Sequence, residues 1–432
     1  MFMIFERFAR DWRPMTYLLL VSFLPLFAAD FGVGNQAEQF SIIERLRNQS
    51  FAAGDFFLED AAKLGQPRFY YAWAVAALTQ FGPLHVVIHA LAVFSTFLLG
   101  LASAVAAAHV FRAGVIGSAL AATSAMLNGG FSLGYAGFLT FDSFQPASIA
   151  IALAISGIVL LLKKKCWWAA LAMIVSSLMH PTIGAEIGVI GFAAVLCARA
   201  IWGAREDVIP TALAFVLFLA GFAVAWVLPN LGVGEAGISD QQFFSILAEF
   251  RAPHHYLGTG LSLRRWLEAV LFLFVCLFVI GFAWQKGGDR ASLTALVLMV
   301  IAVSGLVVLS LYFVDVMHSR LWTTAQVLRN LLLLKWVGFI AFGWLAGRWI
   351  ETRQPELAVL AVLIVLPGLD SLSYSLFFAI ATWSGIGILK LRGRVALAAT
   401  VPAVVFTCYH MFRFGAAEQS VRIGIAVAVL FL

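Results

Sequence analysis

The sequence has 432 residues, of which 62% are hydrophobic and only 12% are charged, and its formal net charge is +6. A soluble protein carries about a quarter charged residues, so this composition excludes an ordinary soluble domain. Excess Lys and Arg in a membrane protein marks cytoplasmic loops more often than nucleic-acid binding, so we set nucleic acid aside as a partner.

Long apolar runs recur along the whole chain. They extend over roughly 15 to 25 residues, which as helices cross about 30 Å of hydrocarbon, and they lack the alternation of barrel strands. The sequence therefore predicts an all-α, polytopic helical membrane protein with about 13–14 transmembrane helices. We expect one transmembrane domain over residues 1–432, which ends within a last helix because the chain stops inside the apolar run "IAVAVLFL".

The basic residues predict the topology. Arg7, Arg10 and Arg13 precede the first apolar run, 15–29, so the N-terminus is expected in the cytoplasm. This run has no small-residue cleavage site before a soluble domain, which indicates a retained helix rather than a signal peptide. Further basic connectors, also predicted to be cytoplasmic, lie at 163–165, 198–205, 285–290, 348–353 and 390–394.

The first large external loop, 30–68, is expected to carry two helices on the membrane surface. In "QFSIIERLRNQS" the apolar residues recur at helical spacing opposite charged ones, which is typical of an interfacial amphipathic helix. Gly54 and Asp55 predict the start of the second helix. The apolar positions of the first helix are Phe40, Ile43 and Leu46.

The next apolar segment, 69–82, is too short for a membrane span. Its fourteen or so residues would reach only about 21 Å as a helix. We expect a half-inserted helix packed at the external face, which also keeps the downstream connectors on their predicted sides.

Acidic residues cluster in the loop 30–68. Asp30 stands at the exit of the first helix, where a partly desolvated carboxylate can act as a general base or a metal ligand. Asp30 and Glu38 are therefore our catalytic candidates, and Asp30 is the candidate metal ligand. The alternative for the other acids of the cluster is an ordinary solvated loop.

The second large external loop, 229–265, contains "EFRAPHHYLGTGLSLRRW", an unusual concentration of basic and titratable residues. Because proline breaks helices, its proline predicts an irregular turn. One interpretation is interfacial anchoring by Tyr, Trp and Arg. The other is capture of a phosphate, to which arginine and histidine donate charge-assisted hydrogen bonds. The candidate substrate-binding residues here are Arg251, His254, His255 and Tyr256.

A third polar segment, "DVMHSRLWTTAQVLRN", adds His318, Arg320 and Arg329 as substrate-binding candidates. Asp315 and His318 are three residues apart and could share one helical face. Arg329 is expected in a helix just below the surface, where a charge costs a few kcal/mol unless it is paired. Its alternative is snorkelling to the interface. We predict that Arg251, His254, His255 and Arg329 surround one external cavity for an anionic lipid headgroup.

The order of the predicted elements along the chain forms a pattern. A first helix is followed by an acidic loop with two surface helices and then by many later spans. The pattern is carried by "DFGVGNQAEQFSIIERLRNQSFAAGDFFLED", "RFYYAWAVAALTQFGPLH", "GGFSLGYAGFLTFDSFQP", "HPTIG" and "LWTTAQVLRNLLLLKW". This pattern resembles the membrane glycosyltransferases of the GT-C superfamily. The resemblance implies sugar transfer from a polyprenyl-phosphate-linked donor on the outer face, with a divalent metal (Mg or Mn) in many members. By position, Asp30 would match the first-loop acid, and Arg251, His254 and His255 the phosphate-facing loop.

We therefore expect a glycosyltransferase of the bacterial inner (plasma) membrane, in contact with the bilayer and its donor lipid. Two other classes stay open. A transporter or flippase of a lipid-linked or anionic substrate would place charged residues mid-span in broken helices, whereas here they collect at one face. A non-catalytic membrane assembly subunit is the third reading.

Overall fold

The computed structural model describes residues 13–28, 31–32, 35–127, 133, 137–141, 143–202, 205–231, 237–251, 253–365 and 372–413. Apart from one bridge between Leu133 and Gly137, these residues form helices, turns and bends. Short 3-10 and π-helices carry the label η. In chain order the helices are α2 (Arg13–Phe23), η1 (Leu24–Ala28), α3 (Asn35–Arg47), α4 (Phe56–Ala61), α5 (Phe69–Leu78), α6 (Leu84–Val110), α7 (Val115–Met126), α8 (Pro146–Leu162), α9 (Cys166–Met179), α10 (Pro181–Ile201), α11 (Arg205–Phe222), η2 (Ala223–Val227), η3 (Leu228–Asn230), α12 (Asp240–Phe244), η4 (Ser245–Arg251), α13 (Pro253–Tyr256), α14 (Leu263–Gln285), α15 (Arg290–Phe313), α16 (Arg320–Ala325), η5 (Val327–Asn330), α17 (Leu331–Glu351), α18 (Pro355–Val365), α19 (Leu372–Ile388), α20 (Gly393–Ala399) and α21 (Val401–Arg413).

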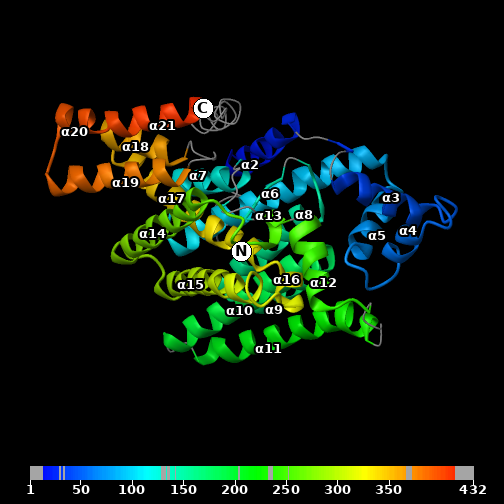
Figure 1. Cartoon of the computed structure of the whole chain (residues 1–432). Coiled ribbons are helices and arrows are strands. Elements are labelled where there is room, and N and C mark those ends of the chain that lie inside the picture. Colours follow the sequence, from blue (N-terminus) through cyan, green and yellow to red (C-terminus); the bar gives the residue numbers. More distant parts are fainter. Residues whose placement is uncertain are drawn as a thin grey trace. The chain divides into compact units, whose positions relative to one another are not determined.

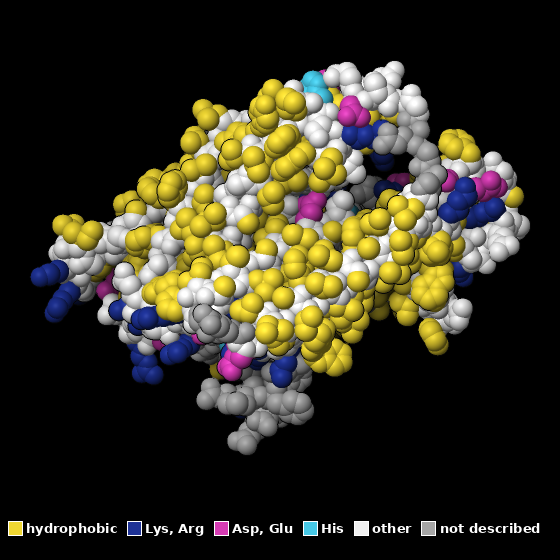
Figure 2. Space-filling model, turned by 90° about the horizontal axis from the view of Figure 1, so that it is seen from below, with side chains coloured by type: hydrophobic (Ala, Val, Ile, Leu, Met, Phe, Trp, Pro, Cys, Tyr) yellow, Lys and Arg dark blue, Asp and Glu magenta, His cyan; other side chains and the backbone are white. Residues whose placement is uncertain are grey.

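The helices are those of a membrane protein. Within the described residues, six are long and apolar enough to cross a membrane, and several shorter apolar helices accompany them. Hydrophobic side chains cover large parts of the surface visible in Figure 2, as expected for helices that face lipid. The chain is thus an all-α polytopic membrane protein, which confirms the predicted fold class. The six long helices are Leu84–Val110, Pro181–Ile201, Glu206–Asn230, Leu263–Gln285, Arg290–Phe313 and Val327–Glu351.

The chain divides into two compact units that interleave along the sequence. Unit 1 consists of Met1–Val21, Gly100–Thr140 and Phe244–Leu432, and unit 2 of Ser22–Leu99 and Phe141–Phe243. The boundary at Leu99 and Gly100 falls within α6. A single transmembrane domain over residues 1–432 stays a prediction.

Unit 2 contains the two helices expected in the first loop. α3 buries Ile42 and Ile43, and its apolar face packs against α5. Asp55 caps α4 by accepting a hydrogen bond from the Leu58 amide at 3.0 Å, as its position before the helix predicts. The apolar side of α3 is therefore occupied by protein, so that helix is tied to the fold.

The short segment after the loop is a helix of ten residues, α5. A helix of this length spans only about 15 Å, so it does not cross a membrane, in line with the sequence analysis. Tyr71, Ala72 and Val75 are buried against α3 and its neighbours. Insertion of α5 at the external face stays a prediction.

Two expected connectors are shorter than predicted because their helices continue. α10 extends to Ile201 and α17 to Glu351, so the connectors placed at 198–205 and 348–353 begin later. As a result Arg199, which sequence reasoning placed in a loop, is a buried side chain of the last turn of α10. The expected turns at 163–165 and at His180–Pro181 are present between consecutive helices.

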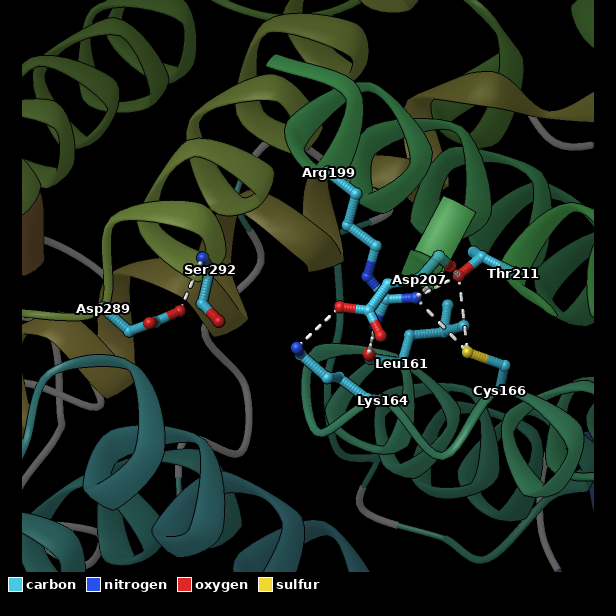
Figure 3. A network of polar contacts seen from close by, with 8 residues as sticks. All are labelled: Leu161, Lys164, Cys166, Arg199, Asp207, Thr211, Asp289 and Ser292. Carbon is cyan, nitrogen blue, oxygen red and sulfur yellow. Dashed lines mark hydrogen bonds and ion pairs between the residues drawn. The ribbon is translucent and has the colours of Figure 1, made fainter. Parts of the chain in front are cut away.

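Buried Arg199 joins the ends of α8, α9, α10 and α11. Its Nη2 donates to the Leu161 carbonyl at 2.6 Å, and its Nη1 donates to Thr211 Oγ1 and lies 3.3 Å from Cys166 Sγ. Figure 3 shows this side chain reaching from α10 toward these partners, with Lys164 Nζ 2.6 Å from the Asp207 carboxylate beside it. The guanidinium thus links backbone and side-chain groups at the ends of four helices through hydrogen bonds.

Replacing Arg199 with methionine should lower the free energy of unfolding by about 2–3 kcal/mol, the scale of a buried hydrogen bond to a charged group. Chemical unfolding in detergent micelles measures this loss. The matched control is Lys164→Met, because the Lys164 side chain is 63% exposed in its ion pair, and such pairs contribute less than about 1 kcal/mol. Equal losses in the two variants would contradict a special role for Arg199.

Unit 1 is built around α17. Its residues 331–347 are all buried, and the helix packs against α7, α14, α15 and α18 (Figure 1). Gly343 and Gly347 of α17 face Ala121 and Gly117 of α7 so closely that a Cβ added at either glycine would clash with the α7 backbone. Such small residues four apart are typical of close helix pairs in membranes.

Candidate functional site

The candidate site lies in unit 1, where η4 and α13 meet α16 and η5. Pro253 is the first residue of α13, a position where its missing N–H costs nothing, so residues 253–256, which we predicted in an irregular turn, form a short helix instead. Both π-helix η4 and helix η5 contact α13. The apolar support of the site consists of Phe244, Ala248, Tyr256 and Val314 with partly buried Leu247, Leu257 and Trp322.

Tyr256 is the centre of the site. Its side chain is buried, and Gln326 Nε2 donates a hydrogen bond to its hydroxyl at 2.5 Å. Burial raises the pKa of the Tyr256 phenol, while the positive charges of Arg329 and, more weakly, Arg251 act in the opposite direction. The phenol therefore stays protonated at neutral pH, and both arginines lie close enough to act on it.

Arg251 and Arg329 thus both act electrostatically on Tyr256, and the predicted cavity shared by the two arginines stays a prediction. Arg251 is the last residue of η4 and is exposed, whereas Arg329 belongs to η5 and is half-buried. His254 and His255 lie in α13 between Arg251 and Tyr256, but their side chains fall outside the described part of the chain. Guanidinium and phenol groups both donate hydrogen bonds to anions.

Asp315 holds the loop after α13 in place. Its carboxylate accepts hydrogen bonds from the backbone amides of Gly258, at 3.3 Å, and Thr259, at 2.7 Å. Trp266 of α14 donates to the Gly258 carbonyl at 3.3 Å. The connection between α13 and α14 is thus fixed at both of its sides, which in turn positions Tyr256.

From their spacing we considered that Asp315 and His318 could share one helical face, but the structure shows that they do not. α15 ends at Phe313, and His318 has a positive φ of 51°, so the chain between them is a turn. The His318 ring stacks on Phe244 with centroids 4.0 Å apart. Substrate binding by His318, and by Arg320, the half-buried first residue of the following helix α16, stays a prediction.

The two acidic candidates have different outcomes. Asp30 lies outside the described residues. Glu38 is the acidic residue of the first turn of α3 in unit 2, where it forms an ion pair with Arg68. Within the described residues, no group of three or more His, Cys, Asp or Glu could hold a metal. Metal binding by Asp30 and a catalytic role of Glu38 stay predictions.

Sequence reasoning missed two buried charges next to the site, Glu268 of α14 and Lys335 of α17, which are 3% and 0% exposed. Phe272 packs on Phe339, and Phe282 packs on Trp344, so α14 and α17 run in the same direction. Glu268 and Lys335 each lie four residues before one of the first two phenylalanines, so they share one level of the two helices. A lysine inside the run "LLLLKW" was the available signal.

Glu268 is held by two cations at the start of its own helix. Its carboxylate lies 2.9 Å from Arg264 Nε and 3.8 Å from Arg265 Nη1. The Glu268 carboxylate is therefore paired within its own helix.

No protein family, curated protein or solved structure matches this chain. The assignment of a function therefore rests on the membrane fold and on the residues around Tyr256.

Proposed function

We propose that the chain is a membrane glycosyltransferase of the GT-C type that transfers a sugar from a polyprenyl-phosphate-linked donor. The observation that supports the proposal is that Arg251 and Arg329 both act electrostatically on the buried phenol of Tyr256, to which Gln326 is hydrogen-bonded. Two guanidinium groups and a protonated phenol all donate hydrogen bonds, which suits a phosphate. The proposed location is the bacterial inner membrane, with the site on the outer face and the N-terminus in the cytoplasm.

The depth of the site agrees with a lipid-linked phosphate. Arg329 is the third residue of the apolar helix Val327–Glu351, about 3 Å from its beginning, and Tyr256 precedes the span that begins at Leu263. Phe250 and Leu263, which flank the cluster in sequence, are 88% and 74% exposed. Arginines at helix ends beside exposed apolar side chains are typical of the headgroup region.

The reaction assigns different tasks to the cations and the acid. An acceptor hydroxyl oxygen bonds to the sugar C1 while the bond from C1 to the phosphate oxygen breaks, and that oxygen takes the electron pair. Arg251 and Arg329 would stabilise the charge that grows on the departing phosphate. The acceptor proton needs a carboxylate base, for which Asp30 is the candidate from the sequence.

A second candidate function is favoured by Glu268 and Lys335. Buried charges within spans are typical of transport pathways, so they suit a transporter or flippase of the same anionic lipid. Both charges, however, lie within about 12 Å of the beginnings of their spans. This placement at one end favours chemistry at the membrane surface. A non-catalytic assembly subunit would bind the lipid and neither cleave nor move it.

Purified protein in nanodiscs with a labelled polyprenyl-phosphate hexose tests the proposal. We expect release of the sugar to an added acceptor, and loss of that release in Asp30→Asn with lipid binding retained, because the amide cannot take a proton. Lipid binding and transbilayer movement without any sugar release would instead identify a flippase. Near wild-type turnover in Asp30→Asn would remove Asp30 from the mechanism.

A further inference from the structure

Gln326, between α16 and η5, has a backbone conformation that glutamine rarely adopts. Its φ of 55° and ψ of 43° place it in the left-handed region, where side chains with a Cβ are strained. Strain of this kind persists where surrounding structure enforces it, and it gathers at binding sites. Here the enforced conformation brings the amide of Gln326 to the hydroxyl of Tyr256.

One end of that amide has no partner among the described residues. Nε2 donates to Tyr256, whereas Oε1 is buried and accepts no hydrogen bond. A buried acceptor without a donor is unfavourable, so a position like this is expected to be filled by a ligand or a water. Tyr256, which accepts through its oxygen, keeps its own proton available for a ligand oxygen.

We propose that Gln326 recognises the part of the headgroup beyond the phosphate, because its Oε1 accepts a hydrogen bond from a hydroxyl of the bound lipid. This inference rests on the proposed phosphate site at Arg251 and Arg329. The donor to Gln326 is a neutral hydroxyl rather than an ammonium, because the two neighbouring guanidinium groups repel a cation. The substrate class is therefore a lipid phosphate that carries a polyol or sugar, not the bare lipid phosphate.

The test compares two probes in nanodiscs, undecaprenyl phosphate and undecaprenyl phosphate bearing a hexose. Wild-type protein should bind the hexosyl lipid about tenfold more tightly, the scale of one hydrogen bond. In Gln326→Met the ratio of the two affinities should fall to about one. Gln285→Met, an exposed glutamine at the opposite end of α14, is the control and should keep the wild-type ratio.

Gln326→Asn is a second variant for the case that Gln326→Met does not fold. Asparagine tolerates the left-handed region, but its shorter side chain does not bring the amide as far as that of glutamine. It too should lose the preference. A preference that persists in either folded variant overturns the role of Gln326 and leaves its oxygen to a buried water. Unchanged affinity for both lipids after removal of Arg251 and Arg329 would overturn the phosphate site itself, so the two failures are distinguishable.

Discussion

Replacing Gly343 with leucine should leave little or no folded protein. A Cβ at this position would collide with the backbone N, Cα and the Cβ of Ala121 in α7. The helix α17 cannot move away easily, since it is buried on every side by α7, α14, α15 and α18. Overpacking of a close-packed interior costs about 1–3 kcal/mol or more, and here rigid backbone rather than a flexible side chain must yield.

The matched control is Gly385→Leu in α19, because a Cβ at Gly385 meets no atom within 4 Å. The yield of monodisperse protein in detergent and its melting temperature measure both variants. We expect Gly385→Leu to resemble the wild type and Gly343→Leu to be recovered, if at all, with a clearly lower melting temperature. Two variants of equal stability would show that the close approach of α7 and α17 contributes little to the fold.

Much of the fold could be predicted because membrane helices depend on composition more than on long-range contacts. The apolar runs of the sequence appear as helices, and Asp55 caps α4 because a local signal is sufficient for an N-cap. Helix ends were less predictable. The basic residue Arg199 suggested a loop, but its hydrogen bonds to Leu161 and Thr211 extend α10 past it.

The site was predictable in its charges and not in its geometry. The arginines in connectors that we predicted to be external departed from the usual distribution of positive charge, which indicated that Arg251 and Arg329 needed an explanation. No sequence pattern predicts that Gln326 adopts a left-handed conformation, or that its amide meets a tyrosine seventy residues earlier. Lys335 was overlooked because the four leucines before it read as an ordinary span, although a lysine within such a run is itself a signal.

Removing both site arginines should produce the largest loss of lipid binding. Arg251→Ala and Arg329→Ala should each weaken binding of undecaprenyl-phosphate lipids by roughly 1.5–3 kcal/mol, the scale of a hydrogen bond to a charged group. Both side chains act on the region around Tyr256. The loss of binding free energy in the double variant should therefore differ from the sum of the two single losses. Nanodisc binding of all three variants and the wild type completes this cycle.

The control is Arg394→Ala, an exposed arginine of α20, which should bind the lipid as the wild type does. If Arg251 and Arg329 served only as interfacial anchors, their removal would lower stability and leave phosphate selectivity over zwitterionic lipid unchanged. A second readout needs no lipid. Both arginines favour the charged phenolate, so the double variant should raise the pKa of Tyr256 further above its ordinary value, seen as phenolate absorbance that appears at higher pH. Additive losses of binding free energy, together with an unchanged pKa of Tyr256, would contradict the shared site. When two arginines hold one phosphate, the loss caused by removing one depends on whether the other is present.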